Sequence, residues 1–151
     1  MPIQIEGLPS GDAKFEEFLR LCVEGLSHQV QGNSGPFLEM WAHTDDALIL
    51  GAIGTYAKGW NRVRTHLLGA SKRLDWTGLS VERLLTTVSD DLAVTVVLEH
   101  MTRYGKEEPE SRTLRTTQVY RREDSGWRLV LRHANPVGLE DDANERALGG
   151  T

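Results

Sequence analysis

The pattern of apolar and polar positions divides the chain into a helical first half and a second half made of strands. Apolar residues recur every three or four positions over Asp12–Gln31, which is the spacing of one buried helix face. Asp12 is a suitable N-cap for this helix, and Gly32 ends it. A short second helix is predicted over Pro36–Ala42, because its proline suits a first helical turn. A third helix with one narrow apolar face is predicted over Trp60–Leu74.

The remaining patterned segments read as strands. Two short ones lie between the second and third helices, and four long ones follow the third helix. In the last strand, Trp127, Leu129, Leu131 and His133 alternate with polar or smaller residues, so we expect them on one face. The predicted strands are 47–53, 56–59, 79–88, 92–104 and the two arms of a hairpin over 114–137, which turns at 123–126.

The resulting order, ααββαββββ, segregates helices from a run of consecutive strands. This order is typical of an α+β fold in which helices pack on an antiparallel sheet. The long strand 92–104 has apolar residues on both faces, whereas a strand with one wet face should alternate cleanly. We therefore expect both sheet faces to be covered, one by the helices and the other by a second copy of the chain.

Composition narrows the class of protein. At 151 residues we expect a single domain over 1–138 and a flexible acidic tail over 139–151. The net charge of −5 without a basic run argues against a nucleic-acid partner. The single cysteine fits a reducing compartment, and no apolar run approaches the ~20 residues that span a membrane. We expect a soluble cytoplasmic protein that does not bind membranes.

Three stretches carry a resemblance to a known family. PFLEMWAHTDD, GAIGTYAKGW and YRREDSGWRLVLRHANP resemble the SnoaL-like and ketosteroid-isomerase-like branch of the nuclear transport factor 2-like superfamily, within a similarity that covers about Asp12–Pro136. The resemblance implies a cone of three helices against a curved sheet, an internal pocket and a homodimer formed through the sheet. The superfamily includes isomerases, polyketide cyclases, dehydratases, ligand binders and dimerisation modules, so the fold alone does not assign the function.

Two polar residues in the apolar strands are candidates for proton transfer. Glu99 lies in an otherwise apolar strand, where burial would raise the pKa of its carboxyl toward the range of a general acid or base. Alternatively it pairs with an arginine such as Arg115 across the sheet. His133 ends the apolar face of the last strand, where it is either a proton shuttle or hydrogen-bonded core. We expect Glu99 and His133 to face one cavity and to form its acid–base pair.

A third catalytic candidate is Asp46, which follows Asp45 at the start of the first short strand. The resemblance to ketosteroid isomerases places a general base in a comparable region. Adjacent aspartates at this position are also typical of a turn. His43 adds a possible metal ligand beside them, but no second cluster has the spacing of a metal site.

Aromatic and polar residues near the expected pocket are candidates for substrate binding. Trp41 and Trp60, at a helix end and a helix start, either line a mouth or pack in the core. Arg115 and Tyr120 have opposite strand parity, so at most one faces the pocket unless a bulge intervenes. Phe37 completes the predicted set.

The sequence thus predicts a pocket protein for a small apolar or carbonyl-bearing compound. The first hypothesis is acid–base chemistry without a cofactor, as in an isomerase, cyclase or dehydratase. The second is a binding module without chemistry, and the third is a dimerisation domain with a closed core.

Overall fold

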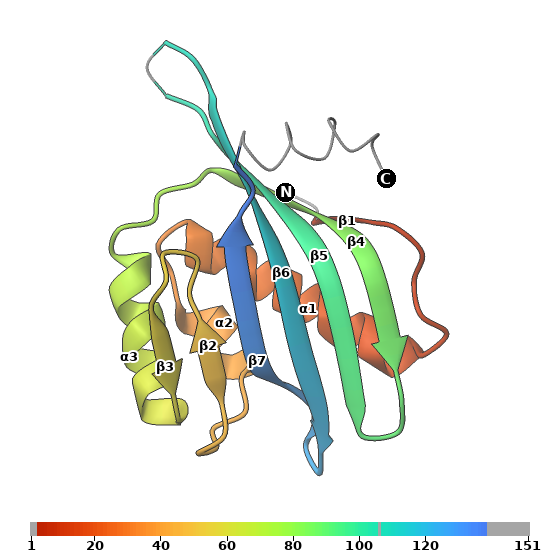
Figure 1. Ribbon diagram of the computed structural model, residues 1–151. Coiled ribbons are helices and arrows are strands. Elements are labelled where there is room, and N and C mark those ends of the chain that lie inside the picture. Colours follow the sequence, from red (N-terminus) through yellow and green to blue (C-terminus); the bar gives the residue numbers. More distant parts are fainter. Residues whose placement is uncertain (1–2, 106, 139–151) are drawn as a thin grey trace.

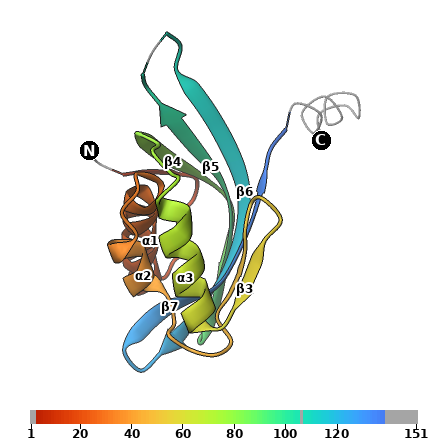
Figure 2. The same ribbon diagram turned by 90° about the vertical axis from the view of Figure 1, so that its left-hand side faces the viewer.

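The computed structural model describes residues 3–105 and 107–138 and has three helices on one face of a curved sheet (Figures 1 and 2). The predicted acidic tail lies outside the described residues. The order of elements agrees with the prediction except for an additional N-terminal strand. The elements are β1 (Gln4–Glu6), α1 (Ala13–Val30), α2 (Gly35–Met40), β2 (Leu48–Leu50), β3 (Tyr56–Lys58), α3 (Trp60–Ser71), β4 (Gly78–Val88), β5 (Leu92–Arg103), β6 (Glu110–Glu123) and β7 (Gly126–Pro136).

The sheet has seven strands in the order β1-β4-β5-β6-β7-β2-β3. The four long strands pair antiparallel, as predicted. However, β1 joins β4 and β2 joins β7 in parallel, so the sheet is mixed. The sequence pattern missed β1 because three residues are too few to show a period of two. Figure 2 shows the sheet curving around the helices, which confirms the α+β cone.

The helix α1 packs its apolar stripe against the inner face of the sheet, which is the face toward the helices. Its N-cap is Asp12, whose side chain accepts a hydrogen bond from the Phe15 amide at 3.0 Å. The Phe15 ring makes edge contacts with Tyr120 and Trp127, at centroid distances of 5.0 and 5.3 Å. Trp127 is 5% exposed and belongs to the core. None of the described helices is long and apolar enough to cross a membrane.

A β-bulge in β7 decides which side chains of that strand face inward. Tyr120 pairs with Leu129, but the preceding Val119 pairs with Leu131, so Val130 is an additional residue. Before the bulge Leu129 points inward, and after it Leu131 points outward while Arg132 points inward. One inserted residue therefore exchanges the two faces for the remainder of the strand.

Candidate functional site

A cavity of about 230 Å³ lies between the helices and the inner face of the sheet. It is bounded by α1, by α3 and the segment that follows it, by the β2–β3 loop (51–55), and by the inner faces of β5, β6 and β7. Its walls are mainly apolar and include Leu26, Phe37, Ile49, Leu67, Trp76 and Met101. The polar side chains that line it are Gln29, Thr55, His66, Arg73, Arg112 and Arg132. The predicted pocket therefore exists, with a small polar set in an apolar wall.

Arg132 forms part of the cavity wall and is anchored from behind by Glu99. Its two terminal nitrogens donate to the two carboxylate oxygens at 2.7 and 2.6 Å, and the side chains are 8% and 3% exposed. The same guanidinium donates to Gln118 Oε1 at 2.9 Å. Burial opposes the charge of Arg132, but the field and hydrogen bonds of Glu99 prevail and raise the pKa of the guanidinium. The charged pair fixes the orientation of Arg132.

A chain of buried polar groups extends from this pair along the inner face. Gln118 Nε2 donates to the Tyr120 hydroxyl at 2.6 Å, and that hydroxyl shares a 2.8 Å hydrogen bond with Thr95. Burial raises the pKa of the Tyr120 phenol far above its ordinary value. The side chains of Glu99, Gln118 and Tyr120 surround only about 10 Å³ of space, apart from the main cavity. These hydrogen-bonded side chains therefore form a packed polar layer and not an open site.

Glu99 and His133 do not form the predicted pair. Glu99 points inward, whereas His133 is exposed on the outer face, opposite Thr117 and Leu50. The prediction was wrong because it assumed that inward and outward side chains alternate without interruption along β7. The bulge at Val130 reverses this alternation for the residues that follow it. Glu99 does pair with an arginine, but its partner is Arg132 and not Arg115.

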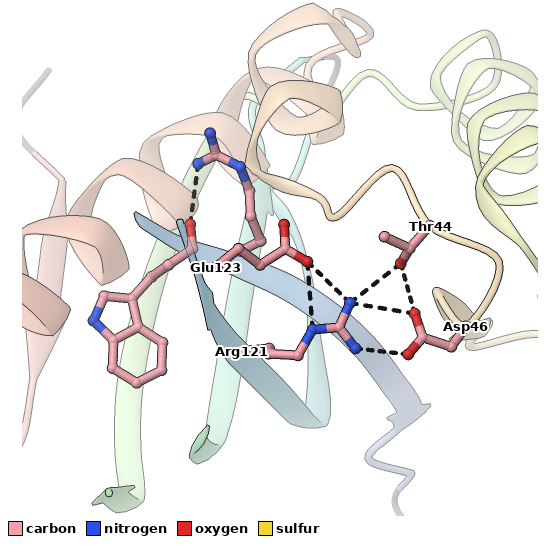
Figure 3. A network of polar contacts seen from close by, with 6 residues as sticks. Thr44, Asp46, Arg121 and Glu123 are labelled. Carbon is pink, nitrogen blue, oxygen red and sulfur yellow. Dashed lines mark hydrogen bonds and ion pairs between the residues drawn. The ribbon is translucent and has the colours of Figure 1, made fainter. Parts of the chain in front are cut away.

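Asp46 lies in a surface ion-pair network outside the cavity. Figure 3 shows Arg121 between the carboxylates of Asp46 and Glu123, with Thr44 beside them. The guanidinium contacts Asp46 Oδ2 at 2.6 Å and Glu123 Oε2 at 3.0 Å. Hydrogen bonds from Arg121 and Thr44 lower the pKa of the Asp46 carboxyl to about 2. A carboxylate with so low a pKa is a poor general base near neutral pH, so the predicted role for Asp46 is not supported.

The aromatic candidates separate into wall and core. Phe37 lines the cavity and is 1% exposed. Trp41 is equally buried but packs edge-on against Phe37 at 6.1 Å and does not reach the cavity, so it is core. Trp60 stacks on the exposed His43 ring at 3.8 Å, also outside the cavity. Neither tryptophan forms the predicted mouth.

The two strand candidates fall on opposite faces, as their parity predicts. Tyr120 is buried on the inner face, whereas Arg115 is exposed on the outer face opposite Leu98. Tyr120 belongs to the packed polar layer, so neither residue lines the cavity.

All six polar residues that line the cavity were missed in the sequence. Gln29 sits on the buried stripe of α1, where one polar residue at a helical apolar position was an available signal. His66 belongs to α3, and Arg73 follows that helix. Arg112 lies before the apolar part of β6, in a segment that reads as a loop. Because they come from separate elements, only their assembly in space identifies them.

Two of these residues have unusual environments. Gln29 is 3% exposed, and its Nε2 donates to the Leu67 carbonyl at 2.9 Å, but its Oε1 has no partner within the described chain. Burial, followed by the charge of Arg73, lowers the pKa of the His66 imidazole. The lowered pKa favours the neutral form of the ring. Within residues 3–105 and 107–138, no group of three or more His, Cys, Asp or Glu side chains could hold a metal ion.

The comparisons with solved structures agree on the fold. A candidate calcium/calmodulin-dependent protein kinase type II association domain from Thiobacillus denitrificans has a TM-score of 0.71 at 20% identity, covering 91% of this chain and 100% of that one. A candidate dehydratase of the NTF2-like family from Streptomyces avermitilis has a TM-score of 0.65 at 16% identity, with 83% and 94% covered. An NTF2-like protein with a cystatin-like fold from Novosphingobium aromaticivorans has a TM-score of 0.63 at 22% identity, with 90% and 86% covered.

Sequence comparison assigns the family. A search of curated proteins finds no significant match. The family model of the SnoaL-like domain matches residues 27–137, which include α2, α3, the sheet apart from β1, and Gln29 and Val30 of the α1 residues that line the cavity. Because the match covers more than half of the chain, the protein belongs to the SnoaL-like domain family.

Proposed function

We propose that the protein binds a small, mainly apolar molecule in the cavity between α1, α3 and the sheet. The cavity itself is the observation that carries this proposal. A dry apolar cavity of about 150 Å³ is enough to bind benzene. At about 230 Å³, this cavity accommodates a substituted ring or a bicyclic compound.

The Gln29 side chain in the cavity wall has one buried acceptor without a hydrogen-bond partner in the described chain. A buried oxygen without a hydrogen bond costs free energy, and such atoms are rare in native structures. Gln29 Nε2 is held by the Leu67 carbonyl, which leaves Oε1 as the acceptor. This oxygen is itself almost fully covered, so the side chain would have to turn before a donor in the cavity could satisfy it.

A cavity-filling variant tests the proposal. Ala70 lines the cavity from α3, whereas Thr65 of the same helix is exposed. A panel of substituted naphthalenes and phenylalkyl compounds is titrated into the protein by calorimetry. We expect binding that Ala70→Phe weakens at least tenfold and that Thr65→Phe leaves unchanged. Equal binding by both variants would place the ligand elsewhere.

Proton transfer on a carbonyl or ring compound is a second candidate function, favoured by His66. It is the titratable side chain among the described cavity residues whose lowered pKa favours the neutral form, so it is able to accept a proton. Hydrogen–deuterium exchange at carbon next to a carbonyl, followed by NMR, tests this role. His66→Gln should abolish the exchange while ligand affinity stays within a few-fold. Exchange that persists in this variant would leave binding as the function.

The second copy of the chain is a proposed partner through the outer sheet face. Val94, Val96 and Leu98 point outward from β5 and are only partly buried. Val119 of β6 neighbours Val94 and Leu131 on the same face, so the apolar surface is continuous. Burying such a surface in a homodimer would remove apolar area from water.

A further inference from the structure

The charged side chains that line the cavity all have one sign. Arg73, Arg112 and Arg132 are cationic, and His66 is able to become so. Within the described part of the chain, no aspartate or glutamate lines this cavity. The chain as a whole carries a net charge of −5, so the positive lining runs against the overall charge. A local excess of this kind is expected where a negative group binds.

The positive charge of Arg132 is already compensated, but that of Arg112 is not. Glu99 neutralises Arg132 through two short hydrogen bonds. Arg112 lies 5.7 Å from the ring centre of Trp76 and has no carboxylate partner among the described residues. Arg103 provides a comparison, because it lies over the same ring at 4.3 Å but pairs with Asp75 at 2.8 Å. Two arginines therefore share one tryptophan, and the one that lines the cavity has no acidic partner within residues 3–105 and 107–138.

Arg73 is the second cation at the exposed edge of the cavity. Arg73 follows α3 and is exposed. Within the described chain it forms no ion pair with a carboxylate. Its charge contributes to lowering the pKa of His66, so its field reaches into the cavity. Arg112 lines the cavity from the sheet and Arg73 from the helical layer, and within the described residues neither guanidinium pairs with a carboxylate.

We propose that the ligand is a small apolar carboxylic acid, bound as its anion. Its carboxylate accepts hydrogen bonds from Arg112 and Arg73 at the mouth, and its apolar body fills the space between Phe37, Ile49 and Met101. This inference rests on the proposed binding function and adds the charge and orientation of the ligand to it. The guanidinium geometry matches a carboxylate, which a neutral amide of the same shape cannot imitate.

Calorimetry with matched pairs of probes tests the inference. The probes are 2-naphthoate with 2-naphthamide, and 3-phenylpropanoate with 3-phenylpropanamide. Each pair keeps the apolar body and changes only the charge. We expect the acids to bind at least tenfold more tightly than the amides at low salt, and the difference to shrink as ionic strength rises.

Variants of two arginines on one strand locate the effect. Arg112 faces the cavity and Arg115 faces outward, and both are exposed, so neither substitution should disturb the core. Arg112→Gln should remove most of the preference for acids, Arg73→Gln should remove part of it, and Arg115→Gln should retain it. Equal affinity of acids and amides for the unmodified protein would overturn the inference and leave the binding function standing. The absence of binding by all four probes would overturn both.

Discussion

The Glu99–Arg132 pair is the buried contact with the largest expected consequence for a single residue. Both side chains are almost fully enclosed, so removing one partner leaves the other charge without compensation. Breaking such a pair costs about 3–5 kcal/mol, whereas replacing both partners with apolar residues is often nearly neutral. In this protein the pair also holds the guanidinium that forms part of the cavity wall.

We therefore predict a strongly non-additive double-mutant cycle. Glu99→Met should lower the free energy of unfolding by about 3–5 kcal/mol, and adding Arg132→Met should recover most of that loss. Urea unfolding measures all four species. Asp46→Asn is the surface control, because its exposed pair with Arg121 should be worth under about 1 kcal/mol. If the losses of the two buried variants simply added, the pair would not be coupled.

A second residue-scale prediction concerns the titration of His66. Burial and Arg73 lower the pKa of the imidazole below its ordinary value of 6.5. In the unfolded chain the ring protonates near pH 6.5, so this group favours the folded state above that pH and its contribution is lost as the pH falls below it. Arg73→Gln should raise the His66 pKa part of the way toward 6.5, as measured by NMR titration. No change in the pKa would assign the shift to burial alone.

At the scale of elements, two helical glycines have opposite roles. A Cβ on Gly25 in α1 would lie 3.0 Å from the Phe37 Cα and 3.2 Å from the Phe37 nitrogen, so the absence of a side chain lets α2 approach α1. A Cβ on Gly69 in α3 would meet no atom within 4 Å. One glycine is required by packing, and the other only weakens its helix.

Replacing glycine with alanine should therefore change the stability of the protein in opposite directions at the two sites. Gly69→Ala should stabilise the protein by about 0.5–1 kcal/mol, which is the difference in helix propensity. Gly25→Ala should destabilise it, because the backbone of α2 has to move away. Thermal unfolding compares the two directly. A stabilising effect of Gly25→Ala would show that α2 shifts without cost.

At the scale of the whole molecule, the exposed apolar face of the sheet is the feature to explain. The outer residues of β5 pair with Val119, Thr117 and Leu85 on the neighbouring strands, and none of the described helices α1, α2 and α3 covers this side (Figure 2). An apolar strip on the outer face, formed by Val94, Val96, Val119 and Leu131, favours association with a second sheet.

We predict a homodimer with twice the mass of the 16.9 kDa chain. Size exclusion with light scattering measures it at micromolar concentration. Val96→Glu, at the centre of the outer face, should give a folded monomer, because it would bury a charge in the interface. Leu8→Glu is the control, since Leu8 is 88% exposed in the loop before α1. A monomeric unmodified protein would contradict the proposal.

The local pattern of apolar and polar residues was sufficient to predict most helices and strands and the fold class. The 3.6-residue period of α1, the Asp12 cap and the four long strands are properties of neighbouring residues, so they were correctly predicted. The parity of Arg115 and Tyr120 was also correct, because β6 contains no additional residue between them. The strand β1 was not predicted, because its three residues do not establish a period, whereas β2 and β3 lie within the longer predicted segments 47–53 and 56–59.

The site was decided by the tertiary structure. The Val130 bulge is a property of the pairing between β6 and β7, and it placed Arg132 inside and His133 outside. The cavity collects Gln29, His66 and Arg112 from α1, α3 and β6, which are far apart in the chain. Glu99 was correctly expected to be buried, but its partner depended on that same bulge. Periodicity determines which residues share a face of one element, whereas register between elements determines which faces meet.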